Sequence, residues 1–168
     1  MLRLRPLRPG DEAAFRAGHA QMAAEGFAFG FVLDQDTPWA EYLRMQAGWR
    51  CGLNLPDGWV PNTFLVAEVD GQLVGRVSIR HELTDFLREE GGHVGYGVLP
   101  EYRRRGYATE ILRQALVIAR SVGVDRVLVT CDDGNIGSIR TIEACGGRLD
   151  SVRPAEPGSA SIRRYLID

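Results

Sequence analysis

The sequence GVLPEYRRRGYAT, residues 97–109, connects two predicted elements of the chain. Apolar residues before Pro100 predict the end of a strand, and Arg103–Arg105 are expected to enter a helix with apolar side chains every three or four positions. The first amides of such a helix have no intrahelical partner and carry the positive end of its dipole. Gly106 lets the backbone come close to a ligand, and Ala108 is too small to block it. The stretch therefore predicts a cradle for an anion such as a pyrophosphate.

Two other interpretations of Arg103–Arg105 are less favoured. A purely solvated helix start is disfavoured because positive side chains oppose the dipole at a helix N-terminus. Nucleic-acid binding is disfavoured because the formal net charge is −2 and no second basic patch with interleaved aromatic residues occurs. All 20 basic residues other than histidine are arginine, so the charge of Arg103–Arg105 alone is weak evidence for a function. Their position between a strand and a helix is the stronger evidence.

The composition limits the class of protein. Hydrophobic residues make up 45% and charged residues 25% of the 168 residues, so we expect one globular domain over residues 1–168. Cys51, Cys131 and Cys145 lack CxxC spacing, which predicts neither a disulfide framework nor a metal site and favours a reducing cytoplasm. No signal peptide and no apolar run long enough for a membrane helix are recognisable, so a soluble cytoplasmic protein without membrane partners is expected.

The pattern along the chain predicts an α+β fold. Residues 2–8 alternate as in a strand, Asp11 is expected to cap a helix reaching about residue 26, and Thr37 a second helix that starts at Pro38. Two β-rich runs around Asp70-Gly71 predict a hairpin. The remaining segments predict the order β-α-α-β-β-β-α-β-α-β-β, with strands at 93–99, 126–131, 148–152 and 161–167 and helices after residues 103 and 135. The last two strands are a candidate surface for a homodimer.

Residues Arg103–Ala108 resemble the [Q/R]-x-x-G-x-[G/A] acetyl-CoA loop of the GNAT superfamily of N-acetyltransferases. The spacing Asn135-x-x-Ser138, followed by Gly146-Gly147, resembles the next cofactor-contacting segment of that superfamily. The resemblance covers residues 63–149 well and extends to the N-terminal elements in their order only. It implies a mixed, mostly antiparallel central sheet with helices on both faces. The acetyl-CoA core is then expected at about 63–149, and the acceptor side at about 11–60 and 81–92.

The resemblance also implies which residues bind acetyl-CoA as co-substrate. Backbone groups of Val98 and Leu99 are expected to pair with the pantetheine arm, and the Val98 amide to donate to the oxyanion. Asn135 and Ser138 are expected to contact the pantetheine from across a cleft between residues 94–99 and 126–131. The pyrophosphate is expected beside the Arg103 and Arg104 side chains, at the amides of Arg105, Gly106, Tyr107, Ala108 and Thr109.

The general acid does not follow the family pattern. The position where many members carry a tyrosine acid holds Ile142, which cannot donate a proton. Tyr96, Tyr102, Tyr165 or a water molecule are the alternatives. Tyr107 lies beside the pyrophosphate loop and is expected to be too far from the sulfur.

The general base also has alternatives. His93, near the start of the central strand, is a candidate because its ordinary pKa lies near neutrality, and a structural hydrogen bond at the strand start is the other interpretation. Glu82 is a second candidate catalytic residue, and His81 lies beside it at the end of the preceding strand. The alternative, which the sequence slightly favours, is that both are ordinary polar loop residues.

The acceptor pocket is expected between the two N-terminal helices and residues 81–92. Gly95 and Gly97 indicate a bulge or a close approach to the neighbouring strand. The expected lining, whose carboxylates would suit a cationic acceptor and whose phenylalanines have core packing as the alternative, is Glu25, Phe27, Phe29, Phe31, Asp34, Trp39 and Asp85.

The leading hypothesis is an acetyl-CoA-dependent N-acetyltransferase that moves the acetyl group directly from the thioester to a primary amine of a small molecule. A protein N-terminus or lysine is the nearest alternative acceptor. A non-catalytic acyl-CoA-binding domain is the alternative from another class, because the tyrosine acid is missing at position 142.

Overall fold

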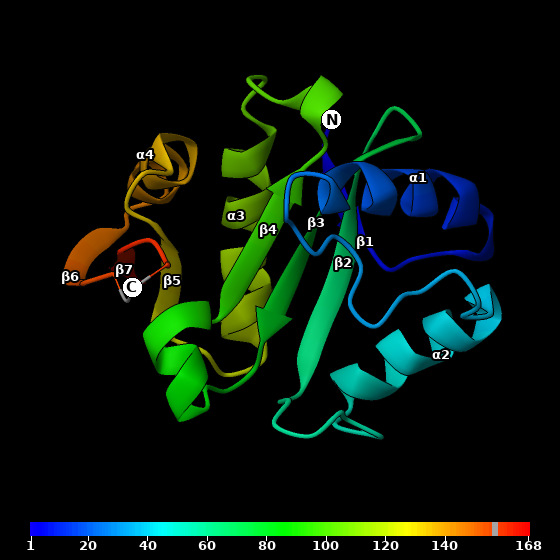
Figure 1. Cartoon of the computed structure of the whole chain (residues 1–168), viewed down its shortest axis with the longest axis horizontal. Helices are drawn as coiled ribbons and strands as arrows, with labels where there is room; N and C mark the ends of the chain where they lie inside the picture. The colour runs from blue at the N-terminus through cyan, green and yellow to red at the C-terminus, as the bar shows by residue number, and fades with distance from the viewer. Residues whose placement is uncertain (156–157) are drawn as a thin grey trace.

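The computed structural model describes residues 1–155 and 158–168, and its elements follow the predicted order (Figure 1). The helices are α1 (Glu12–Ala23), α2 (Trp39–Arg50), α3 (Tyr107–Ser121) and α4 (Ile136–Ala144). The strands are β1 (Arg3–Arg5), β2 (Asn62–Val69), β3 (Gln72–Arg80), β4 (Val94–Val98), β5 (Val127–Asp132), β6 (Arg148–Arg153) and β7 (Ile162–Ile167). Short 3-10 turns at Pro9–Asp11 and Pro100–Tyr102 and a π-helical turn at Leu87–Gly91 complete the described elements. The α+β fold class is confirmed.

The strands form two antiparallel groups rather than one continuous sheet. The first has the order β1-β2-β3-β4 and the second the order β5-β7-β6 (Figure 1). The predicted hairpin of β2 and β3 is confirmed, since Asp70 and Gly71 have φ values of 49° and 80°, as a tight primed turn requires. β4 and β5 are therefore neighbouring strands that belong to different sheets.

Two apolar clusters cover the two faces of the first sheet. Along β3, Val77 and Ile79 point to one face, where they pack with Ile111 and Leu112 of α3. The other face is covered by an aromatic cluster from α1, α2 and the segment between them, which includes Phe15. Both clusters share the same strands, which supports the expectation of one domain.

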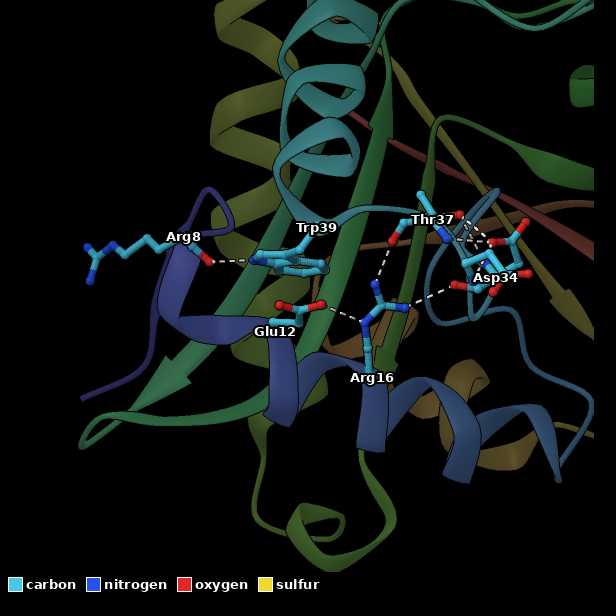
Figure 2. A network of polar contacts seen from close by, with 7 residues as sticks. Arg8, Glu12, Arg16, Asp34, Thr37 and Trp39 are labelled. Atoms are coloured by element: carbon cyan, nitrogen blue, oxygen red, sulfur yellow. Dashed lines mark hydrogen bonds and ion pairs between the residues drawn. The ribbon is translucent and has the colours of Figure 1, made fainter.

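The segment between α1 and α2 is held against α1 by one arginine (Figure 2). Arg16 donates to the carbonyl oxygens of Asp34 (2.9 Å) and Thr37 (2.6 Å) and to the Glu12 carboxylate (2.9 Å). The Asp34 carboxylate accepts from the amide and the hydroxyl of Thr37. These bonds fix the course of residues 34–37 before α2 begins.

Neither predicted capping side chain bonds the amides of its helix. Asp11 does occupy the N-cap position of α1, but its carboxylate accepts from the Arg8 amide and from Arg5 and makes no cap hydrogen bond to α1. The Thr37 hydroxyl donates to Asp34, and Pro38 occupies the N-cap position of α2. In each case a nearby charged partner wins over the helix amides, because hydrogen bonds involving an ionised group are the stronger ones.

Candidate active site

The N-terminus of α3 offers free backbone donors. α3 begins at Tyr107, so Arg103–Arg105 lie in the loop before this helix. The expectation that these arginines enter the helix is therefore wrong. Gly106 is the N-cap residue, with a φ of 79°, and having no side chain it leaves the first amides of α3 uncapped. A Cβ added there would meet no atom of the protein within 4 Å. The glycine is therefore required by the backbone conformation and faces open space, as the predicted anion cradle needs.

The three arginines of this loop differ in what they contact. Arg103 forms an ion pair with Glu25 (2.6 Å) and donates from Nε to the Val98 carbonyl oxygen (3.0 Å). Arg105 donates to the carbonyl oxygen of Glu101 (3.0 Å). Arg104 is exposed and has a positive φ of 62°. The expected phosphate role of the Arg103 side chain does not fit, because its guanidinium ties the end of α1 to the end of β4.

The backbone of β4 presents one free edge. The Leu99 amide donates to the Val74 carbonyl oxygen (3.0 Å), and the Leu99 carbonyl accepts from Tyr102 (2.9 Å). Leu99 therefore has no free amide for a ligand, which corrects the expectation that it pairs with the pantetheine arm. Because successive amides of a strand point to opposite sides, the Val98 amide points away from β3 and toward the β5 side. The geometry required of an oxyanion donor is thus available at Val98.

The opposite side of this region is formed by the start of α4. Asn135 is the N-cap of α4, and its Oδ1 accepts from the Ser138 amide at 3.0 Å. The Ser138 hydroxyl lies 3.0 Å from the Tyr96 hydroxyl of β4. Burial raises the pKa of Tyr96 to about 12, so its phenol stays protonated at neutral pH. Ile142 is fully buried in the core beneath. A partly buried, protonated hydroxyl of β4 therefore contacts α4 one turn before the position where the family tyrosine is missing.

The other two tyrosines contact different groups. The Tyr165 hydroxyl donates to the Glu143 carboxylate (3.2 Å) and accepts from Arg163 (3.4 Å). The Tyr102 ring lies under the Arg105 guanidinium, 5.6 Å from its centroid. Of the three alternatives for the acid, Tyr96 is the one hydrogen-bonded to a residue expected at the cofactor.

His93 joins β4 to β5 at one end of the two strands. Its amide donates to the Leu128 carbonyl oxygen (2.7 Å), and its Nδ1 accepts from the Leu128 amide (2.9 Å). Burial, together with the nearby Arg88 and Arg80, lowers the pKa of His93 to about 4. Because Nδ1 accepts from the backbone, the neutral ring carries its proton on Nε2 and has no free lone pair. The expected base role does not fit this geometry, and the alternative of a structural hydrogen bond is confirmed.

Most side chains expected to line the acceptor pocket bond or pack against other residues of the protein. The carboxylates of Glu25 and Asp34 bond Arg103 and Thr37, so neither is free to bind a cationic acceptor. Phe29 and Trp39 are buried in the aromatic cluster, as the core alternative predicted. The two remaining acids, Asp85 and the candidate base Glu82, are exposed.

Phe27 and Phe31 do lie at the expected place. A Cβ on Gly97 would come within 2.6 Å of the Phe27 ring, so this ring packs directly on β4. Phe31 lines a cavity of about 220 Å³ on the α1–α2 face of the sheet, near the end of β3. The lining also includes Trp59, Asn62, Ser78, Arg80 and Leu87.

Sequence reasoning did not select Asn62, Ser78 or Arg80. The signal was present as polar residues at alternate positions of a strand that is otherwise apolar, in VSIR at the end of β3. Their burial is what makes them notable, since Asn62 and Ser78 are only 4% and 2% exposed.

A family model described as acetyltransferase (GNAT) domain matches residues 1–148 of the chain. The chain belongs to the GNAT family of acetyltransferases. As a GNAT acetyltransferase it is an acyltransferase. A comparison with curated protein sequences gives no significant match.

Solved structures share the fold of this GNAT acetyltransferase. The protein yncA of Salmonella typhimurium, solved with its cofactor acetyl-CoA, is 19% identical with a TM-score of 0.68, over 99% of this chain and 93% of that one. A GNAT-family acetyltransferase of Streptococcus pneumoniae is 20% identical with a TM-score of 0.66, over 99% and 98%. RimJ of Mycobacterium smegmatis, solved with CoA-disulfide, is 21% identical with a TM-score of 0.67, over 99% and 81%. At these identities the likeness shows the fold.

The described residues of this GNAT acetyltransferase contain neither a membrane-spanning helix nor a metal-binding cluster. None of its helices within residues 1–155 and 158–168 has the length and apolar character needed to cross a membrane. The same residues contain no group of three or more histidine, cysteine, aspartate or glutamate side chains arranged to hold a metal ion.

Proposed function

We propose that this GNAT acetyltransferase transfers the acetyl group of acetyl-CoA directly to a primary amine of a small molecule. The observation that carries the acceptor class is the cavity of about 220 Å³ on the α1–α2 face of the sheet. A cavity of this size, with Phe31 and Trp59 meeting edge to face at 5.7 Å, fits a compact acceptor better than an extended polypeptide. This favours a small molecule over a protein N-terminus or lysine.

The cofactor side of the proposal rests on free backbone donors. The uncapped amides of Tyr107, Ala108 and Thr109, after Gly106, would hold the pyrophosphate at the positive end of α3. Arg104 and Arg105 are the arginines placed to add charge at the rim, while Arg103 is engaged with Glu25. Asn135 and Ser138 would contact the pantetheine arm from α4.

The chemical step needs a neutral amine, a donor for the oxyanion and a proton for the leaving sulfur. The Val98 amide would donate to the oxygen of the carbonyl as the carbon–nitrogen bond forms. The Tyr96 hydroxyl would supply the proton to the sulfur as the carbon–sulfur bond breaks, because burial keeps it protonated and it lies at α4. Glu82 stays a prediction as the base that accepts the proton of the amine.

An amine-panel screen for CoA release tests the proposal. The full chain is incubated with acetyl-CoA and individual free amines, amino acids, short peptides and a lysine-containing protein, and free thiol is measured. We expect release with one class of small amines and none with the peptides or the protein. Release with peptides alone would contradict the small-molecule acceptor. Failure of acetyl-CoA to bind in calorimetry would contradict the assignment of the cofactor residues.

The expected homodimer stays a prediction with one supporting observation. β6 is the edge strand of the second sheet, and its Leu149 and Val152 are 49% and 46% exposed. Exposed apolar residues on an edge strand favour pairing with a second chain. Sedimentation analysis at several concentrations would show whether the chain associates, and a monomer throughout would exclude it.

A further inference from the structure

Two arginines, Arg76 fully buried and Arg80 partly buried, lie side by side on the face of the first sheet that α1 and α2 cover. Arg76 and Arg80 alternate with Val77 and Ile79 along β3, so both point away from the α3 core. Their guanidinium groups meet over Gly95 of β4, where an added Cβ would lie 3.7 Å from Arg80 Nη2 and 3.8 Å from Arg76 Nη1. Gly95 leaves this space open and stands in the same strand as Val98.

No carboxylate among the described residues forms an ion pair with either arginine. Arg76 donates to three carbonyl oxygens, those of Ala28, Phe29 and Gly95, and its guanidinium lies over the Phe27 ring, 4.5 Å from the centroid. Burial lowers the pKa of both arginines, and Arg80 adds to the lowering at Arg76. Two neighbouring cations without an anion are costly to bury, so an anion bound there would be favoured.

Arg80 has donors left for such an anion. Its Nη1 donates to the carbonyl oxygens of Gly91 (2.9 Å) and Gly92 (3.0 Å). Within residues 1–155 and 158–168, no hydrogen bond uses Arg80 Nε or Nη2. These two nitrogens form the planar edge that binds a carboxylate through two parallel hydrogen bonds. Arg80 also lines the cavity, so this edge belongs to a side chain that a ligand can reach.

Asn62, which lines the same cavity, has an acceptor unpaired within the described part of the chain. Asn62 donates from Nδ2 to the Val60 carbonyl oxygen (3.2 Å), whereas its buried Oδ1 has no partner among the described residues. A buried oxygen of this kind normally has a hydrogen-bond donor, which here would be an N–H group of the ligand. Phe31 and Trp59 form the apolar wall beside it. The lining therefore combines a cation, an acceptor oxygen and an apolar surface.

We propose that the acceptor amine of this acetyltransferase also carries a carboxylate, which Arg80 binds in the cavity beside β4, as in a free amino acid with an apolar side chain. The inference rests on the proposed function. It replaces the expectation of a cationic acceptor, because Glu25 and Asp34, two of the three carboxylates expected to bind one, are engaged elsewhere and the cavity presents a guanidinium. A carboxylate fits better than a dianionic phosphate, since Arg80 offers one free guanidinium edge and each nitrogen of Arg76 already donates to a backbone carbonyl oxygen.

The test compares matched acceptors that differ in the carboxylate. Initial rates of CoA release are measured for free L-amino acids, and for each active one with its carboxamide and with the amine that lacks the carboxyl group. With the unchanged protein we expect the free acids to have a KM lower by a factor on the order of 10–100. In Arg80→Gln that preference is expected to disappear, because acid and amide then meet the same neutral side chain.

Two controls make the outcome decisive. Arg44→Gln changes an exposed arginine of α2 and is expected to keep the preference. Arg80→Lys keeps the positive charge but lacks the planar edge, so it is expected to keep part of the preference for the free acid. If Arg80→Gln fails to fold, shown by its melting curve, Arg80→Lys and the acid–amide comparison in the unchanged protein still decide.

The possible outcomes separate this inference from the proposed function. Equal rates for acids and amides in the unchanged protein, or an acid preference that survives in folded Arg80→Gln, would overturn the carboxylate assignment alone. Preference for a phosphate- or sulfonate-bearing amine over the matched carboxylate would overturn it as well. CoA release with no amine of the panel would contradict both proposals.

Discussion

The arginines of this protein have different roles that depend on the atoms around each guanidinium. Arg16 fixes the segment after α1, Arg103 ties α1 to β4, and Arg80 lines the cavity with two nitrogens that bond no described residue. The exposed pair Arg103–Glu25 is expected to contribute little stability by itself, since surface ion pairs contribute about 0–1 kcal/mol. What matters at the residue scale is which donors remain free.

Tyr96→Phe tests the proposed proton donor. The substitution removes one hydroxyl and keeps the ring in the core, so we expect kcat to fall by about 100-fold, the contribution typical of a positioned acid. KM for acetyl-CoA is expected to change little. Steady-state rates with a saturating amine measure both. Tyr165→Phe is the matched control, because its hydroxyl bonds Glu143 and Arg163, and it is expected to keep kcat. An unchanged kcat in Tyr96→Phe would show that the proton comes from elsewhere.

His93→Asn tests the structural role of His93. The folded pKa of His93 is about 4, below its ordinary value of 6.5, so the unfolded chain binds more protons between these pH values. The stability contribution is therefore fully present above pH 6.5 and is lost as the pH falls toward 4. Asn Oδ1 can still accept from the Leu128 amide but does not titrate. We expect the free energy of unfolding, from urea melts between pH 4 and 7, to depend less on pH in His93→Asn.

A comparison within the histidines makes the pH prediction specific. Burial also lowers the pKa of His81, and hydrogen bonds from Arg5 lower the pKa of Asp11 and Glu68, so the remaining slope in His93→Asn is expected to come from these groups. His93→Asn with the slope of the unchanged protein would contradict the assignment of the hydrogen bond between His93 Nδ1 and the Leu128 amide.

At the scale of elements, the start of α3 combines a glycine in the left-handed region with uncapped amides. Two substitutions of Gly106 separate these properties. Gly106→Ala and Gly106→Trp are both expected to lower the free energy of unfolding by about 1–2 kcal/mol, because each places a Cβ at a φ of 79°.

Gly106→Trp also fills the open space before the helix. We therefore expect its affinity for acetyl-CoA to fall at least about tenfold further than that of Gly106→Ala. Calorimetry with acetyl-CoA and urea melts measure the two effects. Equal affinities in both variants would show that the pyrophosphate binds elsewhere.

At the scale of the whole molecule, two sheets meet at β4 and β5 and are bonded there through His93 and Leu128 (Figure 1). A ligand that contacts β4, α3 and α4 together would couple both sheets. Acetyl-CoA at 100 times its Kd is expected to stabilise the fold by about 2.7 kcal/mol, which raises Tm by about 5–10 °C for a chain of this size. Thermal unfolding followed with and without acetyl-CoA measures the shift. Acetyl-pantetheine, which lacks the pyrophosphate, is expected to raise Tm by less. An unchanged Tm with acetyl-CoA would contradict the proposed site.

Much of the fold could be predicted because its signals are local. The hairpin at Asp70-Gly71, the apolar face of α3 and the Asn135 cap of α4 each depend on residues within one or two turns of the chain. The Asp11 and Thr37 side chains do not bond the amides of their helices, because charged partners, Arg5 and Asp34, compete for the same side chains. The break between β4 and β5 has no local signal.

The sequence by itself determined the order of the elements and the uncapped helix start after Gly106, because periodicity, turn chemistry and helix-terminal donors act within a few residues. Only the tertiary structure decided which groups are free. Glu25 meets Arg103 across 78 residues, and His93 meets Leu128 across 35. Such contacts engage some of the predicted site residues, such as Glu25 and His93. They leave Tyr96, a predicted alternative, and Arg80, which the sequence did not indicate, facing the places where substrates are proposed to bind. Which side chains from distant segments contact one another depends on how the elements pack, and a single stretch of sequence does not determine that packing.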